Sequence, residues 1–208
     1  KEVLQSSPEH LARKAWELPV EFIPEISQIC RDIKIDFGIT PFYIDAVLAN
    51  EKYVDFFKIA SYEILWKNLF QECLKTKKPL IFSSGMATLS EVDDAMAQIP
   101  ENRIDDITLL HCSSAYPTNP ESCNLSVIEL FKERYACKVG WADHTCNKAV
   151  ILSSLIQWNA ECIELHIDID GHGAEADSGN CWLPSYLKDL FSMYQISRDA
   201  LYGDITFI

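Results

Sequence analysis

The 208-residue sequence has no run of apolar residues near the ~20 that a membrane-spanning helix needs, although 48% of its residues are apolar. Its first residues, KEVLQSSPEH, lack the charged, apolar and small-residue order of a signal peptide. We therefore expect a cytoplasmic chain that makes no contact with a membrane. The length suits one domain with a substantial core and is short for a two-domain enzyme, so residues 1–208 are predicted to form a single domain.

Basic residues are few, with 18 Lys and Arg against 31 Asp and Glu, which gives a net charge of −13 with His neutral. A surface of this charge repels the phosphate backbone of nucleic acids, so no nucleic-acid partner is expected. A small anionic substrate is not excluded, because a pocket needs only one or two well-placed lysines and some backbone N–H groups.

Two common motifs are missing. The eight cysteines contain no C-x-x-C pair, which argues against a zinc knuckle or a thioredoxin-type site. They lie in apolar runs such as LLHC and ECIEL, so we predict reduced core thiols, with Cys112, Cys137 and Cys162 in strands. No G-x-G-x-x-G follows a predicted strand, so the dinucleotide-binding fingerprint is lacking as well.

What the sequence does have is a regular alternation of strands and helices. Short apolar runs indicate six strands, at residues 33–39, 56–60, 79–83, 107–112, 137–142 and 162–167. Most are apolar throughout, which is typical of parallel strands covered on both faces. Helical patterns occupy residues 64–75, 88–96, 125–131, 149–158 and 186–194, and a capping box opens the second of these. The first 30 residues are predicted to be helical, in two pieces broken near Pro19 and Pro24.

A doubly wound sheet and a (β/α)₈ barrel share this alternation. Polar, chemically capable residues follow nearly every predicted strand, which favours the barrel because its active site is built from the carboxyl ends of many strands. A full barrel usually takes ~250 residues and eight strands. We therefore predict an incomplete TIM-type barrel that lacks two βα units.

Three groups at the strand ends are candidates for chemistry. His144 and His166 end neighbouring strands, where two imidazoles could hold a divalent metal ion, although a single histidine is more often a hydrogen-bonded core or rim residue. Asp143 could orient an imidazole or cap the following helix. Lys58 suits an ion pair with phosphate or carboxylate, a Schiff base, or a plain salt bridge. Residues 83–85 offer hydroxyls to an anion or form an ordinary turn.

The motifs KIASYE, PLIFSSGM, LLHCSSAYPT, GWADHT and ELH, followed by Asp177 and by Leu183-Pro184, occur in this order. They resemble motifs of the N-acetylneuraminate (sialic acid) synthases, whose relatives make pseudaminic and legionaminic acids. In that family a barrel condenses phosphoenolpyruvate with an N-acyl amino sugar such as N-acetylmannosamine. The products are a nine-carbon 2-keto sugar acid and phosphate.

The resemblance implies a role for each matching residue. His144 and His166 correspond to ligands of Mn²⁺ or Mg²⁺, an ion that polarises the sugar aldehyde. Glu63 is the candidate for proton transfer, which makes Glu63, His144 and His166 the predicted catalytic residues. The predicted substrate-binding residues are Thr40, Lys58, Ser61, Ser83, Ser84, Ser114, Tyr116 and Asp177. A homodimer is compatible with the family, in which a C-terminal domain reaches the neighbouring subunit.

The sequence also departs from the family pattern. Ala142 stands where the family has Ser, Ser114 where it commonly has Asn, and Glu175 and Ala176 replace Gly-Pro. An early Glu, a Lys-Phe-Gln segment and the antifreeze-like C-terminal domain are not found. Two alternatives therefore stay open: a non-catalytic homologue that binds a sugar or a phosphorylated ligand, and a lysine-dependent aldolase that uses Lys58.

Overall fold

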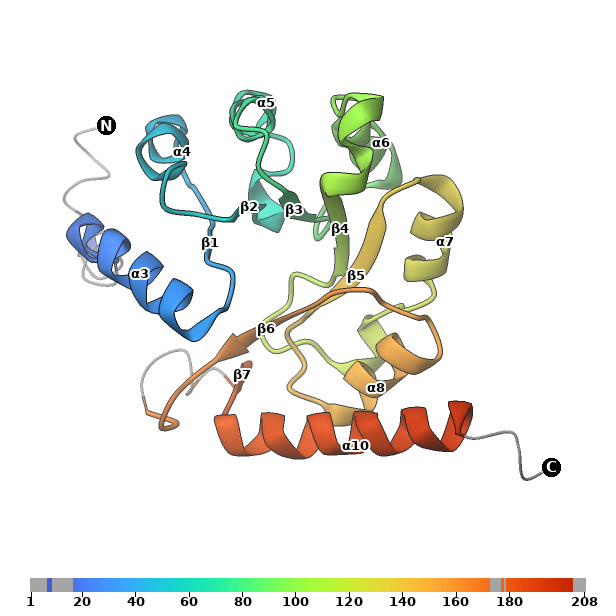
Figure 1. Cartoon of the computed structure of the whole chain (residues 1–208). Coiled ribbons are helices and arrows are strands. Elements are labelled where there is room, and N and C mark those ends of the chain that lie inside the picture. Colours follow the sequence, from blue (N-terminus) through green and yellow to red (C-terminus); the bar gives the residue numbers. More distant parts are fainter. Residues whose placement is uncertain (1–6, 9–16, 173–176, 178, 204–208) are drawn as a thin grey trace.

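The computed structural model describes residues 7–8, 17–172, 177 and 179–203. Its centre is one sheet of parallel strands in the order β1 to β7, so that each strand pairs with its neighbours in sequence. The strands are β1 (Gly38–Ile39), β2 (Phe56–Ile59), β3 (Leu80–Ser83), β4 (Ile107–Cys112), β5 (Lys138–Asp143), β6 (Ile163–Ile167) and β7 (Cys181–Trp182). The sheet curls, and the helices lie around it (Figure 1). The predicted incomplete TIM-type barrel is confirmed.

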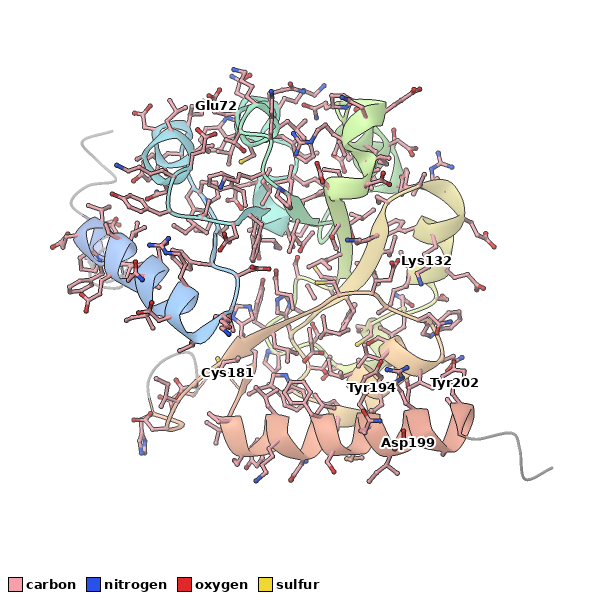
Figure 2. All side chains as sticks on the ribbon, in the orientation of Figure 1. Glu72, Lys132, Cys181, Tyr194, Asp199 and Tyr202 are labelled. Atoms are coloured by element: carbon pink, nitrogen blue, oxygen red, sulfur yellow. The ribbon has the colours of Figure 1, made fainter. Side chains whose placement is uncertain are left out.

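Helices alternate with these strands. They are α3 (Ile23–Ile33), α4 (Ile44–Asn50), α5 (Lys67–Lys75), α6 (Leu89–Met96), α7 (Val127–Arg134), α8 (Lys148–Ile156) and α10 (Pro184–Tyr202). Short 3₁₀ helices are η1 (Val20–Phe22), η2 (Ser61–Glu63), η3 (Glu101–Asp106) and η4 (Pro120–Ser122). The last helix packs on α8, with Tyr194 and Tyr202 toward it (Figure 2). None of the helices described is long and apolar enough to cross a membrane.

Several predicted boundaries need correction. Pro24 does not break a helix but sits in the first turn of α3, where a missing N–H costs no hydrogen bond. The helix expected from residue 64 begins at Lys67, after η2, and α10 runs well beyond residue 194. Helix α4 and strand β7 were not predicted. Residues 1–6 and 9–16, also predicted to be helical, lie outside the described part of the chain.

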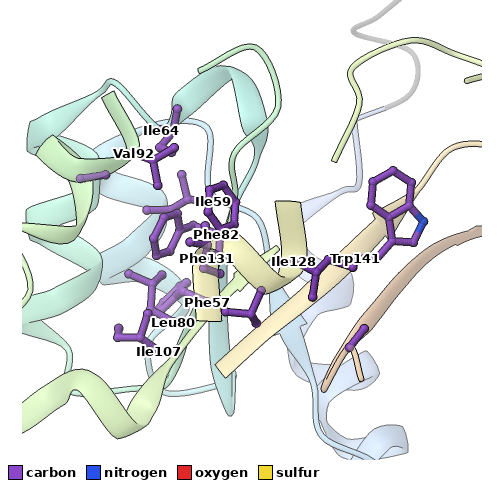
Figure 3. Packing of buried hydrophobic residues seen from close by; sticks show 14 of the residues in the cluster. Phe57, Ile59, Ile64, Leu80, Phe82, Val92, Ile107, Ile128, Phe131 and Trp141 are labelled. Atoms are coloured by element: carbon purple, nitrogen blue, oxygen red, sulfur yellow. The ribbon is translucent and has the colours of Figure 1, made fainter. Parts of the chain in front are cut away.

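The main core lies between the sheet and the helices. It contains Phe57, Phe82 and Trp141 from three strands, all fully buried, and Ile128 and Phe131 from α7 (Figure 3). Because side chains alternate along a strand, the intervening residues face the concave side of the sheet. There a small cluster of Leu110, Cys112 and Ala142 packs with Ile81 and Cys162. Lys58, Ser83 and Glu164 belong to the same concave face.

The cysteines are all free thiols, as predicted. Cys112 lies in β4, while Cys137 and Cys162 immediately precede β5 and β6 rather than lying within them. Burial raises the pKa of Cys137 to about 11, so this thiol stays protonated at neutral pH.

Candidate active site

The carboxyl ends of the parallel strands share one end of the curled sheet, and the predicted residues gather there. Lys58 lies on β2, is 8% exposed, and donates a hydrogen bond to the carbonyl of Ile59 at 3.2 Å. Its ammonium nitrogen also lies 3.2 Å from a carboxylate oxygen of Glu164 on β6. Strands β3, β4 and β5 separate these two strands in the sheet, so the ion pair bridges its concave side.

A second cluster of side chains comes from the loops that follow β2, β3 and β4. The Ser61 hydroxyl lies 3.0 Å from the sulfur of Cys112. A Cβ atom on Gly85 would lie 2.3 Å from Ser114 Oγ and 2.5 Å from Cys112 Sγ, so any side chain at position 85 would displace these two groups. Burial raises the pKa of the Cys112 thiol, so this group adds no negative charge near Lys58. A pocket of about 420 Å³ opens beside the cluster, lined in part by Ser113, Ser114 and Met86.

Three polar atoms in this region are buried without a hydrogen-bond partner among the described residues: Ser83 Oγ, Ser114 Oγ and Glu63 Oε2. Ser83 is only 1% exposed. Burial raises the pKa of Glu63, although its own backbone N–H and Lys58 act in the opposite direction. Buried polar groups normally have partners, so these atoms are typical of a site that binds a polar ligand.

His144 and His166 lie side by side beyond β5 and at the end of β6, with ring centroids 5.2 Å apart. The Nδ1 atom of His144 is 2.8 Å from the carbonyl of Ser113. Since a carbonyl only accepts, Nδ1 carries the proton and Nε2 keeps its lone pair. Burial lowers the pKa of His144, which favours the neutral imidazole that a metal ion requires. Tyr116 packs on His144 with ring centroids 4.1 Å apart.

This geometry fits a shared metal ion only in part. With metal–nitrogen bonds of about 2.1 Å, two imidazoles on one ion have ring centres about 5 Å apart, close to the spacing here. Within the described residues, however, no three His, Cys, Asp or Glu side chains form a metal-binding group. The two imidazoles are therefore a partial ligand set, and the other positions would need substrate or water oxygens.

Asp143 takes neither of its predicted roles. Its buried carboxylate accepts hydrogen bonds from the indole N–H of Trp141 (3.2 Å) and of Trp182 (3.0 Å). It also accepts bonds from the Thr145 hydroxyl and the Cys146 backbone N–H. Helix α8 is capped instead by Asn147, which accepts from the backbone of Ala149. Asp143 therefore joins β5 to β7 beside His144.

The other predicted residues are placed less tightly. Thr40 follows β1, one position beyond the Ile39–Phe57 pair and thus level with Lys58. Ser84 is buried, and its backbone N–H donates to the carbonyl of Leu110. Asp177 is exposed, and residues 173–176 and 178 lie outside the described residues, so the roles of Asp177, Glu175 and Ala176 stay predictions.

His111 packs against the core and also helps to line the pocket described above. Its Nε2 is 2.8 Å from the carbonyl of Cys123, and its ring packs against Phe131 and Trp141. Burial lowers its pKa below the ordinary value of 6.5, mainly by desolvation. In the unfolded chain the same imidazole takes up a proton near pH 6.5. The folded state is therefore favoured above that pH, and its advantage falls as the pH drops from 6.5 toward the lower folded value.

We expect a His111→Gln variant to lose less stability between pH 7.5 and pH 5 than the parent protein does. The difference in slope is at most about 1.4 kcal/mol per pH unit. Urea unfolding at several pH values measures it. His172→Gln, which changes an exposed histidine, is the control and should match the parent slope. Equal slopes for all three proteins would show that His111 titrates normally.

Comparison with known proteins identifies the family. The model of the NeuB family matches residues 3–205. The chain belongs to the NeuB family. This confirms the resemblance to the sialic acid synthases and their relatives.

Individual NeuB-type relatives agree. The chain is 37% identical over 152 residues to the pseudaminic acid synthase of Helicobacter pylori, covering 71% of this chain and 44% of that protein. It is 32% identical over 191 residues to the N,N'-diacetyllegionaminic acid synthase of Campylobacter jejuni, a match that covers 90% of this chain and 57% of that protein. The crystal structure of the sialic acid synthetase of Leptospira borgpetersenii in complex with citrate superposes with a TM-score of 0.86 at 26% identity. The match covers 98% of this chain and 72% of that one. The chain spans about half the length of the curated relatives it matches.

Ala142 marks one departure from the family motif. It is 1% exposed on the concave face, paired with Cys112 on β4 and Glu164 on β6. The resemblance implies that this face binds the phosphate of phosphoenolpyruvate, and on that expectation Ala142→Ser should tighten the binding by about 1.5–3 kcal/mol, because it adds a hydrogen bond to a charged group. Titration calorimetry measures the gain. No gain would show that position 142 does not contact the phosphate.

Proposed function

We propose that this chain acts as a sialic-acid-type synthase, which condenses phosphoenolpyruvate with an N-acyl amino sugar and releases phosphate. One observation carries the proposal. The end of a single curled sheet brings together a buried lysine, unpartnered hydroxyls and two neighbouring imidazoles. Membership of the NeuB family supports the same activity. The domain of residues 1–208 is, on this proposal, part of a synthase barrel.

The anion would bind on the Lys58 side. The ammonium of Lys58 supplies the charge, and Ser61 and Ser83 supply hydroxyls from the two neighbouring strand ends, with Thr40 and Ser84 beside them. Ser83 gains a partner for a hydroxyl that is otherwise buried and unpaired. A charge-assisted contact of this kind is among the stronger hydrogen bonds in proteins.

The sugar would bind on the other side, near Tyr116 and Asp177, with Ser114 between the two sides and close to Ser61. His144 and His166 would hold a divalent ion such as Mn²⁺ or Mg²⁺, which supplies polarisation of the sugar aldehyde. Glu63 suits proton transfer to the aldehyde oxygen, since its raised pKa favours the protonated acid. C3 of phosphoenolpyruvate forms the new bond to the aldehyde carbon, water adds at C2, and phosphate leaves from the tetrahedral intermediate.

The aldolase alternative is weaker on one observation. A Schiff-base lysine must have its nitrogen free to attack a carbonyl, whereas the nitrogen of Lys58 is held in an ion pair 3.2 Å from a carboxylate oxygen of Glu164. A borohydride trapping experiment without added metal distinguishes the aldolase from the synthase. Borohydride with pyruvate should leave Lys58 unlabelled, and labelling would support the aldolase.

The decisive test is phosphate release by the 208-residue chain with Mn²⁺. Release should require both phosphoenolpyruvate and N-acetylmannosamine, and the Glu63→Gln variant should lose it because the proton donor is removed. Release without the sugar would indicate a phosphatase activity. Binding of phosphoenolpyruvate without any release would favour the non-catalytic homologue.

A further inference from the structure

The ion pair between Lys58 and Glu164 raises a question that the proposed function leaves open. The two charged atoms lie 3.2 Å apart, and their side chains are 10% and 34% exposed. An ammonium group has three protons to donate. One is donated to the carbonyl of Ile59, and the ammonium charge is already matched by the Glu164 carboxylate at 3.2 Å before any further anion arrives.

A phosphate on Lys58 would lie close to the Glu164 carboxylate. Two like charges at such short range repel strongly where solvent is partly excluded. Glu164 also connects the two halves of the site, since it lies on β6 two residues before His166 and forms the ion pair with Lys58 on β2. The Cys162 thiol on the same face adds no further charge, because burial raises its pKa. The carboxylate of Glu164 therefore competes directly with an incoming anion.

We propose that Glu164 is a built-in competitor for the phosphate position on Lys58. This inference rests on the proposed function. Glu164 holds Lys58 when the site contains no anion, releases it when phosphoenolpyruvate arrives, and takes it back as phosphate leaves. An anion that contacts only Lys58 and the nearby hydroxyls displaces the carboxylate poorly. An anion that also carries a second charged group for the rest of the site displaces it well. Glu164 thus selects phosphoenolpyruvate over inorganic phosphate and assists product release.

The test is the affinity for inorganic phosphate, measured by titration calorimetry on the full chain. Glu164→Gln keeps the size of the side chain and removes the competing charge. We expect it to bind phosphate about tenfold more tightly than the parent, with a smaller gain for phosphoenolpyruvate. The control is Glu121→Gln, which removes the same charge from the exposed turn η4 and should leave both affinities unchanged. Circular dichroism of each variant shows whether the fold is retained.

The outcomes separate the inference from the function on which it rests. If the parent binds phosphate and Glu164→Gln binds it equally or less well, Glu164 positions Lys58 for the anion, and the competitor role is wrong. If Glu121→Gln gained a similar affinity for phosphate, the effect would come from the net charge of the protein and not from the position of Glu164, which would also overturn the proposal. If neither the parent nor Glu164→Gln binds phosphate or phosphoenolpyruvate, the anion site itself is wrong, and the proposed function fails with it.

Discussion

Replacing His144 or His166 by alanine is expected to remove divalent-metal binding while the domain stays folded. The two imidazoles are neighbours, and the hydrogen bond from His144 to Ser113 leaves its Nε2 free to bind an ion. Among the described residues two imidazoles lie at this position, so the loss of either leaves a single strong ligand there. Mutation of a residue that only hydrogen-bonds to a metal ligand lowers the metal affinity about 10–100-fold. Loss of a ligand itself should cost more, so we expect the Mn²⁺ affinity to fall at least ~100-fold here.

Mn²⁺ binding followed by electron paramagnetic resonance measures this effect directly. His172→Ala is the matched control, because it removes an exposed imidazole outside this pair and should leave the affinity unchanged. Thermal unfolding in the presence of a chelator checks that each variant folds without metal. Parent-level Mn²⁺ affinity in both His144→Ala and His166→Ala would rule out the metal assignment, and the proposed polarisation of the aldehyde would go with it.

The sequence predicted those parts of the fold that carry a local signal. Strands β4 and β5 are six residues long and largely apolar, and helix α6 starts at the predicted capping box, where Thr88 and Glu91 bond reciprocally. Strand β7 has two residues, too few to show a periodic pattern, and α4 has no side-chain cap at its start. Strand β7 is defined by its pairing with β6 and helix α4 by its packing on α5, contacts that a single sequence does not reveal.

The site divides in the same way. Lys58, His144 and His166 were predicted because each stands at or near the end of a recognisable strand. The ion pair between Lys58 and Glu164 was not predicted, because side chains of β2 and β6 reach each other only when the sheet curls (Figure 1). The bond between Asp143 and Trp182 joins residues 39 positions apart through a strand too short to predict. Contacts made across the curled sheet therefore need the three-dimensional structure.

Removing the Lys58 charge is the second change from which we expect a large effect. Lys58→Met keeps most of the length of the side chain. On the proposed function it should weaken phosphoenolpyruvate binding by about 2–5 kcal/mol, since the proposed buried charged contact to the phosphate is lost. The same variant leaves Glu164 without its partner. Because Glu164 is about one-third exposed, water compensates part of that loss, and we expect a destabilisation of only about 1–2 kcal/mol.

A double variant separates binding from stability. Lys58→Met combined with Glu164→Gln removes the unpaired carboxylate, so urea unfolding should return toward the parent value. Calorimetry should still show the weakened phosphoenolpyruvate binding of Lys58→Met, because the positive charge is absent. If the double variant bound phosphoenolpyruvate like the parent, Lys58 would be a purely structural partner of Glu164. The anion would then have to bind elsewhere at this end of the sheet, since Lys58 and its two serines would no longer account for it.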